Sequence, residues 1–309
     1  MSESSLVIKN SGSWFLVKTN AGNLVECKIK GNFRIKDIKT TNPIAIGDRV
    51  LFERISDTSG LIYEICERRN YIIRRSTNLS KQAQVIAANL DLAALVVTVK
   101  YPETYTVFID RFLATAEAYR IPACLIFNKI DLYDESDLEY VRALAHLYST
   151  MDYKIFEVSA LQPETLTELI DFLKGKISLF SGNSGVGKST LIKTILPDLD
   201  IKIGDISATH NRGMHTTTLS EMYELQNGGY IIDTPGVKGF GIVDMEKDEI
   251  GHYFKDIFAV SKNCKFANCQ HIREPDGAVR KAVENHEVAQ SRYQSYLNIL
   301  VDCDPGKYG

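Results

Sequence analysis

The sequence lacks the features that would assign it to a membrane or secreted class. No apolar run approaches the ~18 residues that a bilayer-spanning helix needs, and the longest candidate, residues 90–99, contains Asp91. The opening residues, Met-Ser-Glu-Ser-Ser, do not form a basic segment followed by an apolar one, as a secretory leader would. The six cysteines are scattered apart from one close pair, which argues against a disulfide framework and is compatible with a metal site. We therefore expect a cytoplasmic protein without membrane contact.

The chain also lacks a strong overall charge, but its charges are unevenly distributed. Its 309 residues carry a formal net charge of −3, which does not by itself predict nucleic-acid binding. Residues 1–75 hold 13 basic against 8 acidic residues, so the remainder is acidic. A basic N-terminal module on an acidic body fits a module that contacts phosphate backbones, although a basic surface without a ligand explains the charge equally well.

Hydrophobic patterning divides the chain into three parts, with no internal repeat. Residues 1–72 contain four or five short strands separated by turn residues, which predicts an all-β barrel of the OB-fold type that binds RNA. Residues 73–244 alternate strands with helices, which predicts an α/β domain with a mostly parallel sheet. Residues 245–309 predict a small α-helical module around a loop that holds Cys264, Cys269 and His271.

One motif is specific enough to predict a nucleotide site. An apolar strand leads into Gly182-Asn183-Ser184-Gly185-Val186-Gly187-Lys188-Ser189-Thr190, and a helix follows, which is the context of a phosphate-binding loop (P-loop). Its glycines allow backbone N–H groups to turn toward a phosphate, and the helix N-terminus adds positive potential. Lys188 can reach the β- and γ-phosphates, and Ser189 can ligate Mg²⁺.

A second magnesium-binding element follows in the sequence. Asp233 and Gly236 belong to an Asp-Thr-Pro-Gly motif, in which the carboxylate can hold Mg²⁺ through water and the glycine N–H can contact a γ-phosphate. A threonine in the polar segment 210–218 would supply a further Mg²⁺ ligand. Thr217 is favoured by its position before the next strand, although Thr216 and Thr218 leave the register open.

A base-reading motif completes the predicted site. The Asp131 carboxylate of Asn128-Lys129-Ile130-Asp131 can accept hydrogen bonds from the N1–H and 2-amino groups of guanine, which adenine does not offer. Asn128 would brace the loop and the Lys129 stem would pack on the ring, while Ser159 and Ala160 would complete the pocket. These residues predict GTP or GDP with Mg²⁺ as ligands. A P-loop ATPase or kinase would require that Asp131 reads no base.

The order of the motifs is reversed relative to an ordinary GTPase, in which the P-loop comes first. The order seen here follows from the usual one by two changes. The chain is cut ahead of the strand that precedes the base-reading motif, and the old termini are joined through residues 161–177. Neither change alters the sheet. Five motifs that all follow strand ends in one rotated order make chance a poor explanation. The sequence therefore predicts a circularly permuted α/β P-loop GTPase core.

With this order the chain resembles the RsgA (YjeQ) family of circularly permuted GTPases over essentially its whole length. The resemblance rests on the motifs Asn-Lys-Ile-Asp, Gly-Asn-Ser-Gly-Val-Gly-Lys-Ser-Thr, Arg-Gly-Met-His-Thr-Thr-Thr and Asp-Thr-Pro-Gly-Val. It implies GTP hydrolysis stimulated by the 30S ribosomal subunit, contact with rRNA of that subunit (16S rRNA), and a role in late small-subunit maturation. We expect a monomer. A rival interpretation is an RNA-binding assembly factor that uses GTP and GDP only as a conformational sensor.

The chain departs from a generic GTPase at Val237, which stands where Ras-like enzymes carry the glutamine that orients water. Turnover by the isolated chain should therefore be slow. His215 is the candidate for this task, because a neutral imidazole can accept a proton from water near pH 7. With Lys188 and Thr217 it forms the predicted catalytic set, although His215 would otherwise be a surface histidine of the 210–218 segment.

The chain departs from the resembled family in its C-terminal module. The family zinc motif, Cys-x4-Cys-x-His-x5-Cys, is matched by Cys264, Cys269 and His271, but Gly277 occupies the fourth position. We expect one Zn²⁺ per chain, with Asp276, a water molecule or Cys303 as candidates for the fourth ligand. The alternative is a module that has lost its metal.

Overall fold

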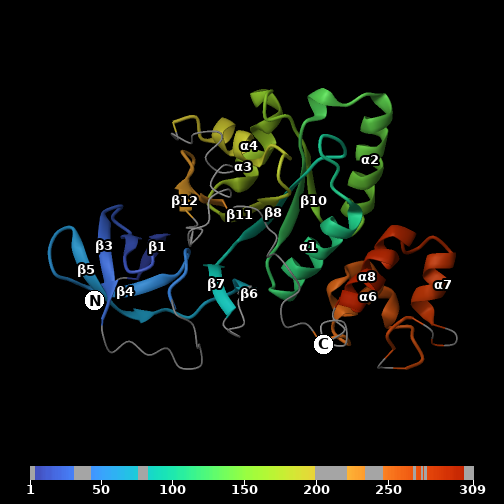
Figure 1. Cartoon of the computed structure of the whole chain (residues 1–309), viewed down its shortest axis with the longest axis horizontal. Coiled ribbons are helices and arrows are strands. Elements are labelled where there is room, and N and C mark those ends of the chain that lie inside the picture. Colours follow the sequence, from blue (N-terminus) through green and yellow to red (C-terminus); the bar gives the residue numbers. More distant parts are fainter. Residues whose placement is uncertain are drawn as a thin grey trace, which may run out of the picture.

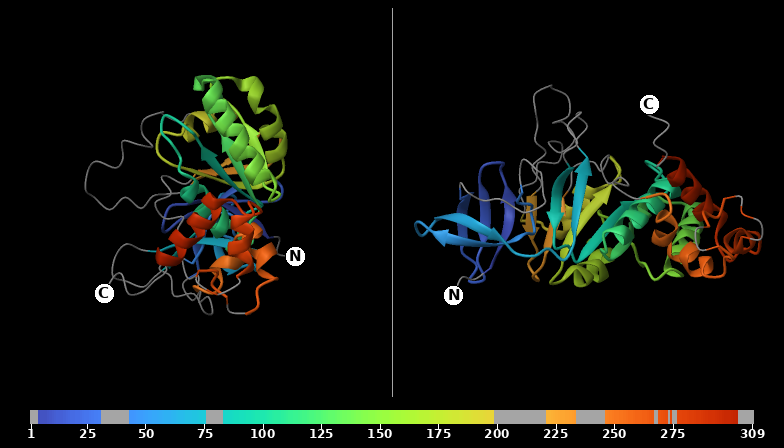
Figure 2. Two further views of the ribbon diagram at one scale, coloured as in Figure 1. Left: turned by 90° about the vertical axis from the view of Figure 1, so that its right-hand side faces the viewer. Right: turned by 90° about the horizontal axis from the view of Figure 1, so that it is seen from below.

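Three parts of the chain lie in a row, with the N-terminal barrel and the C-terminal helices at opposite ends of an α/β domain (Figures 1 and 2). The computed structural model describes residues 4–30, 43–75, 83–198, 221–233, 246–266, 269–272, 274 and 277–302. Among the helices of these ranges, none is long and apolar enough to cross a membrane.

The N-terminal strands close into a five-stranded barrel, because the last strand in the order β1-β2-β3-β5-β4 pairs back with β1. Alternate residues point inward, as expected for strands with one buried face, and they form a core around Phe15 and Val25. The expected OB-like barrel is confirmed. Its strands are β1 (Ser5–Asn10), β2 (Phe15–Lys18), β3 (Leu24–Ile29), β4 (Arg49–Arg54) and β5 (Ser59–Ile65). A hairpin of β6 (Tyr71–Arg75) and β7 (Ala83–Ala88) follows.

The central domain has the spatial strand order β10-β9-β8-β11-β13-β12, with only β12 antiparallel to its neighbour β13. The strands are β8 (Leu92–Val97), β9 (Ala123–Phe127), β10 (Lys154–Glu157), β11 (Ile177–Gly182), β12 (Glu221–Glu224) and β13 (Tyr230–Asp233). The helices are α1 (Thr106–Ala118), α2 (Glu135–Ser149), α3 (Thr167–Leu173) and α4 (Lys188–Ile195), with short 3-10 turns at Ile130–Leu132 and Pro163–Leu166.

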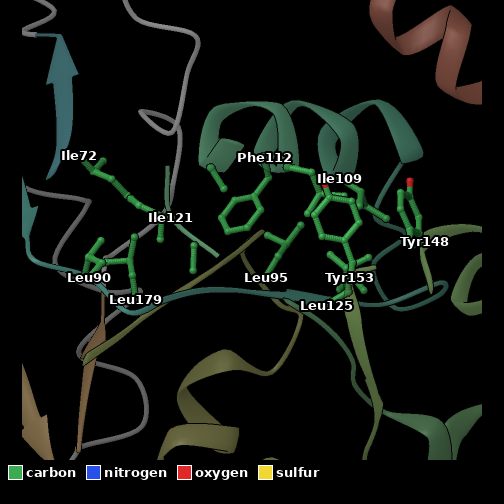
Figure 3. Close-up of a cluster of buried hydrophobic side chains, with 14 of the residues drawn as sticks. Ile72, Leu90, Leu95, Ile109, Phe112, Ile121, Leu125, Tyr148, Tyr153 and Leu179 are labelled. Carbon is green, nitrogen blue, oxygen red and sulfur yellow. The ribbon is translucent and has the colours of Figure 1, made fainter. Parts of the chain in front are cut away.

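The central sheet is buried on both faces because helices pack on both sides of it, and successive strand residues point to opposite sides. In β8, Leu95 and Val97 join the cluster beneath α1 and α2, whereas Ala94 and Val96 join the cluster beneath α3 and α4. Figure 3 shows Phe112 of α1 reaching down toward Leu95. This arrangement explains the nearly continuous apolar runs in the sequence.

The topology confirms the expected permutation. The P-loop strand β11 lies at the centre of the sheet, between β8 and β13, although it is the fourth strand of the domain along the chain. The predicted connection through residues 161–177 contains helix α3, which leads from β10 into β11. The chain enters the domain at β8, whereas the strand that precedes the base-reading motif is β9, so the cut lies one strand earlier than predicted.

The barrel and the central sheet are joined edge to edge, a connection that the sequence did not predict. Strand β1 pairs antiparallel with β12, with Lys9 opposite Glu221. Lys18 of β2 also forms an ion pair with Glu224 of β12. The result is one eleven-stranded sheet that runs from the barrel into the nucleotide-binding domain.

The C-terminal module is fastened to α1 by a buried charge network. The module comprises a 3-10 turn (Ile250–Tyr253), α6 (Lys255–Ser261), α7 (Ala278–Glu284) and α8 (Gln290–Asp302). Arg292 of α8, only 1% exposed, donates to Asp110 of α1 over 2.7 Å and to Asp256 of α6 over 2.9 Å. Tyr148 donates to the same Asp110 carboxylate over 2.9 Å.

Replacing Asp110 with alanine should destabilise the protein strongly, because Arg292 would keep a buried charge with only one acid beside it. We expect a loss of about 3–5 kcal/mol in the free energy of unfolding. The matched control is Asp302→Ala, which removes a partly exposed α1–α8 ion pair with Arg111 and should cost less than about 1 kcal/mol. Urea denaturation of both variants measures the difference, and equal losses would contradict this assignment.

Candidate nucleotide site and candidate metal centre

The predicted P-loop lies where the sequence placed it, between the end of β11 at Gly182 and the start of α4 at Lys188. Gly185 and Gly187 have φ values of 86°, in the left-handed region that favours glycine. A Cβ atom on Gly182 would approach the backbone oxygen of Val96 to 2.6 Å, so this position also needs glycine to fit against β8. Asn183, Ser184, Ser189 and Thr190 lie on the loop and the first turn of α4.

A single buried side chain, Asn128, joins three of the predicted motifs. Its Nδ2 atom donates to the backbone oxygen of Val186 in the P-loop over 2.8 Å. Its Oδ1 atom accepts from the backbone N–H of Ala160 over 3.0 Å. Gly187 accommodates this contact, because a Cβ atom there would lie 2.5 Å from Nδ2. The bracing role expected of Asn128 therefore has a direct structural counterpart.

Lys129 makes a second connection to the P-loop. Its Nζ atom donates to the backbone oxygen of Gly185 over 2.7 Å and also to that of Tyr101. Burial lowers the pKa of Lys129, and the nearby Asp131 opposes this shift. Asp131 itself is exposed at the edge of the site, where its carboxylate is accessible to a base.

The loop that holds Ser159 and Ala160 is fixed from two sides. The Thr194 hydroxyl of α4 donates to the backbone oxygen of Ala160 over 2.8 Å. The backbone N–H of Leu161 donates to the buried Ser159 hydroxyl over 3.1 Å. The expected base-pocket residues are thus brought beside the P-loop helix.

Two residues of this neighbourhood were not predicted from the sequence. Tyr133 donates to the backbone oxygen of Asn128 over 2.8 Å and accepts from the N–H of Val99 over 3.1 Å. Tyr101 supplies the backbone oxygen that Lys129 contacts. The polar loop after β8 was a signal for Tyr101, whereas Tyr133 follows the 3-10 turn after β9 and left no signal.

Lys188 and Asp233 meet in a buried ion pair, with about 8% of each side chain exposed. They come from the P-loop and from the end of β13, which pairs in parallel with β11. The sequence predicted them as phosphate-binding and magnesium-binding groups, and the structure brings them together. Gly236, Thr217 and His215, together with Val237, lie outside the described residues.

The three predicted zinc ligands also converge. The candidate ligand atoms of Cys264, Cys269 and His271 all lie within 4.8 Å of one another. The distance from Cys264 Sγ to His271 Nδ1 is 3.5 Å. Two ligands of a tetrahedral Zn²⁺ site, one sulfur and one nitrogen, are expected to lie about 3.5 Å apart. Burial lowers the pKa of His271 and so favours the neutral imidazole that a metal requires. The residues therefore fit a zinc ion.

The loop that carries these ligands is held by surrounding polar groups. Both carboxylate oxygens of Glu274 accept backbone N–H groups, from Gln270 over 2.7 Å and Ile272 over 2.9 Å. Tyr293 donates to the backbone oxygen of His271 over 2.6 Å, and Tyr296 donates to that of Gln270 over 2.8 Å. Such outer contacts orient the ligands of metal sites.

The fold and these clusters define a circularly permuted P-loop GTPase flanked by a barrel and a Cys/His module. The RsgA GTPase family model matches residues 65–243, and the RsgA N-terminal domain model matches residues 5–62. The chain belongs to the RsgA family.

Similar proteins agree with this membership. A relative from Bacteroides fragilis, called small ribosomal subunit biogenesis GTPase RsgA, is 59% identical over 303 residues and the match covers 98% of each chain. A relative of the same name from Porphyromonas gingivalis is 49% identical, again over 98% of each chain. The crystal structure of YjeQ from Thermotoga maritima has a TM-score of 0.81 at 36% identity and 98% coverage of both chains. YloQ, described as a circularly permuted GTPase, has a TM-score of 0.76 at 28% identity, with 98% of this chain and 95% of that one covered.

Gly187→Ala should damage GDP binding, because its methyl group would displace the Asn128 side chain. Loss of the two Asn128 hydrogen bonds would cost about 2–3 kcal/mol, or roughly a 100-fold loss of affinity. Gly175→Ala is the matched control, since Gly175 has a similar φ of 70° but nothing within 4 Å of a built Cβ. Titration with a fluorescent GDP analogue measures both, and unchanged affinity in Gly187→Ala would argue against the Asn128 contact.

Proposed function

We propose that this protein is a GTPase that binds the 30S ribosomal subunit, hydrolyses GTP when the subunit stimulates it, and assists late small-subunit maturation. The observation that carries this proposal is the Asn128 contact, which joins the base-reading motif to the P-loop at one edge of a permuted sheet. The relatives named as small ribosomal subunit biogenesis GTPases support the choice of partner.

In this proposal GTP or GDP lies across the carboxyl ends of β9, β10 and β11. Asn128, Lys129, Asp131, Ser159 and Ala160 bind or support the guanine. The P-loop and the start of α4 hold the phosphates through Gly182, Asn183, Ser184, Gly185, Val186, Gly187, Lys188, Ser189 and Thr190, with Gly236 at the γ-phosphate. Ser189, Thr217 and Asp233 would hold Mg²⁺, which supplies positive charge against the phosphates when bound.

The Lys188–Asp233 ion pair suggests how these groups respond to nucleotide. A buried charge needs a partner to offset its desolvation, and each of the two residues has the other. A bound phosphate would give Lys188 a second anion to contact. Asp233 could then turn toward a cation, so nucleotide binding would rearrange the end of β13 that leads into residues 234–245.

We propose that the barrel contributes to contact with 16S rRNA. Trp14 is 43% exposed, and the Lys28 Nζ atom lies 4.1 Å from the centre of its ring. An exposed aromatic ring beside a cation suits both base stacking and phosphate contact.

We further propose that the protein is a cytoplasmic monomer that binds one Zn²⁺, with domains at residues 1–72, 73–244 and 245–309. The last barrel strand ends at Ile65, ahead of the first proposed boundary, which falls within β6.

Purified 30S subunits should accelerate GTP turnover by at least about tenfold, because a partner that orders the residues around the γ-phosphate lowers the barrier for phosphoryl transfer. Release of inorganic phosphate is measured with 30S subunits and, as a control, with 50S subunits. Binding of GTP without any acceleration would instead favour the rival function, an assembly factor that only senses the nucleotide.

His215 is proposed to position or deprotonate the attacking water, since Val237 offers no hydrogen bond. His215→Ala should reduce 30S-stimulated turnover by roughly 100-fold or more, the range of general acid–base catalysis, and leave GDP affinity unchanged. His210→Ala is the control within the same segment. Full stimulated turnover in His215→Ala would remove His215 from the mechanism.

A further inference from the structure

The Cys/His cluster supplies three metal ligands and no fourth within the described part of the chain. Only Cys264, Cys269 and His271 form a group of potential ligands there. Glu274 is the nearest acid along the chain, but both of its carboxylate oxygens already accept backbone N–H groups of the same loop. Its carboxylate shapes the loop, and it is not part of the group of ligand atoms that lie within 4.8 Å of one another.

Gly277 supplies no donor at the position where the family motif has its fourth cysteine, and the other two candidate ligands, Asp276 and Cys303, lie outside the described residues. Gly277 directly precedes α7, with φ −60° and ψ 121°, a backbone conformation that any residue adopts. Among the described residues, a Cβ atom built there would meet just the backbone oxygen of Glu274, at 3.5 Å, which is ordinary contact. Neither its backbone angles nor contact with the described residues requires glycine at this position, so we expect a side chain with a donor atom to be accommodated.

Metal sites with three protein ligands differ from sites with four in whether they can exchange a ligand. Structural zinc is almost always held by four protein ligands, whereas three protein ligands leave one position for an exchangeable group. Two thiolates and a neutral imidazole around Zn²⁺ also give a net charge of zero. Such a centre can therefore accept one further neutral or singly anionic donor without accumulating large negative charge.

We propose that this chain holds zinc through Cys264, Cys269 and His271 and keeps the fourth coordination position open for an outside imidazole nitrogen or thiolate sulfur. The inference rests on the zinc binding proposed above. Cys264 and Cys269 are both partly exposed, which gives such a donor access. An incoming imidazole replaces a metal-bound water, and an incoming thiol also releases its proton to solvent, so no oxidation or reduction is involved.

Cobalt(II) can report whether the fourth coordination position is open, because its visible spectrum depends on the number and type of ligands in a tetrahedral site. The full chain, stripped of metal, is loaded with one equivalent of Co²⁺ and titrated with imidazole and then with 2-mercaptoethanol. We expect the spectrum of the wild-type protein to change and to saturate with each probe.

Gly277→Cys should close the position. Its Co²⁺ spectrum should gain a thiolate contribution and no longer respond to either probe. Its Zn²⁺ affinity in a chelator competition should rise by at least about tenfold, since even outer-shell partners change metal affinity by 10–100-fold. Gly277→Ala is the matched control, because it adds the same Cβ without a donor, and it should behave as the wild type. Circular dichroism establishes that both variants are folded.

Three outcomes would overturn the inference. Absence of bound metal would also contradict the proposal that the chain binds zinc. The proposed GTPase function would not be affected, because GTP turnover tests it separately. A wild-type spectrum that binds Co²⁺ but ignores both probes would mean that the chain itself supplies a fourth ligand. A response that appears only in Cys303→Ser or Asp276→Asn would identify that ligand.

Discussion

The two hydrogen bonds of the Asn128 amide constrain the whole nucleotide site. One amide group can donate and accept at the same time, and here it donates to the P-loop and accepts from the loop after β10. Because Asn128 is buried, losing either partner would leave a polar group unsatisfied away from water. The three loops therefore hold one another in place, and the proposed guanine and phosphate contacts depend on that arrangement.

This cross-link also explains why permutation is tolerated. The contacts run between strand ends, and the sheet order brings those ends together regardless of where the chain is cut. Permutation changes what each edge of the domain is attached to. The chain leaves β13 toward the Cys/His module, which is fastened to α1 by Arg292, while β12 is paired with the barrel. A ligand of either outer part could thus act on the segments that flank the nucleotide.

Much of this arrangement could be predicted from local sequence signals. The P-loop, the predicted base-reading motif and the Cys/His cluster are short segments with fixed spacing, and the β/α alternation predicted the sheet. Contacts between distant residues could not be predicted. Arg292 and Asp110 are 182 positions apart, and the β1–β12 pairing joins two strands that carry no motif and lie far apart in the sequence. Tyr133 and Tyr101 contact the site through an ordinary hydroxyl and a backbone oxygen, which leave no motif. Thr217 and His215 stay predictions.

Asp131, in a site assembled by Asn128, is proposed to recognise guanine. The most direct test is the affinity of Asp131→Asn for GDP and for xanthosine diphosphate, in which an oxygen replaces the 2-amino group. An asparagine amide can donate to that oxygen but no longer accepts from two donors. We expect the variant to lose GDP affinity and to gain affinity for xanthosine diphosphate. Unchanged preference for GDP over xanthosine diphosphate would contradict this proposal.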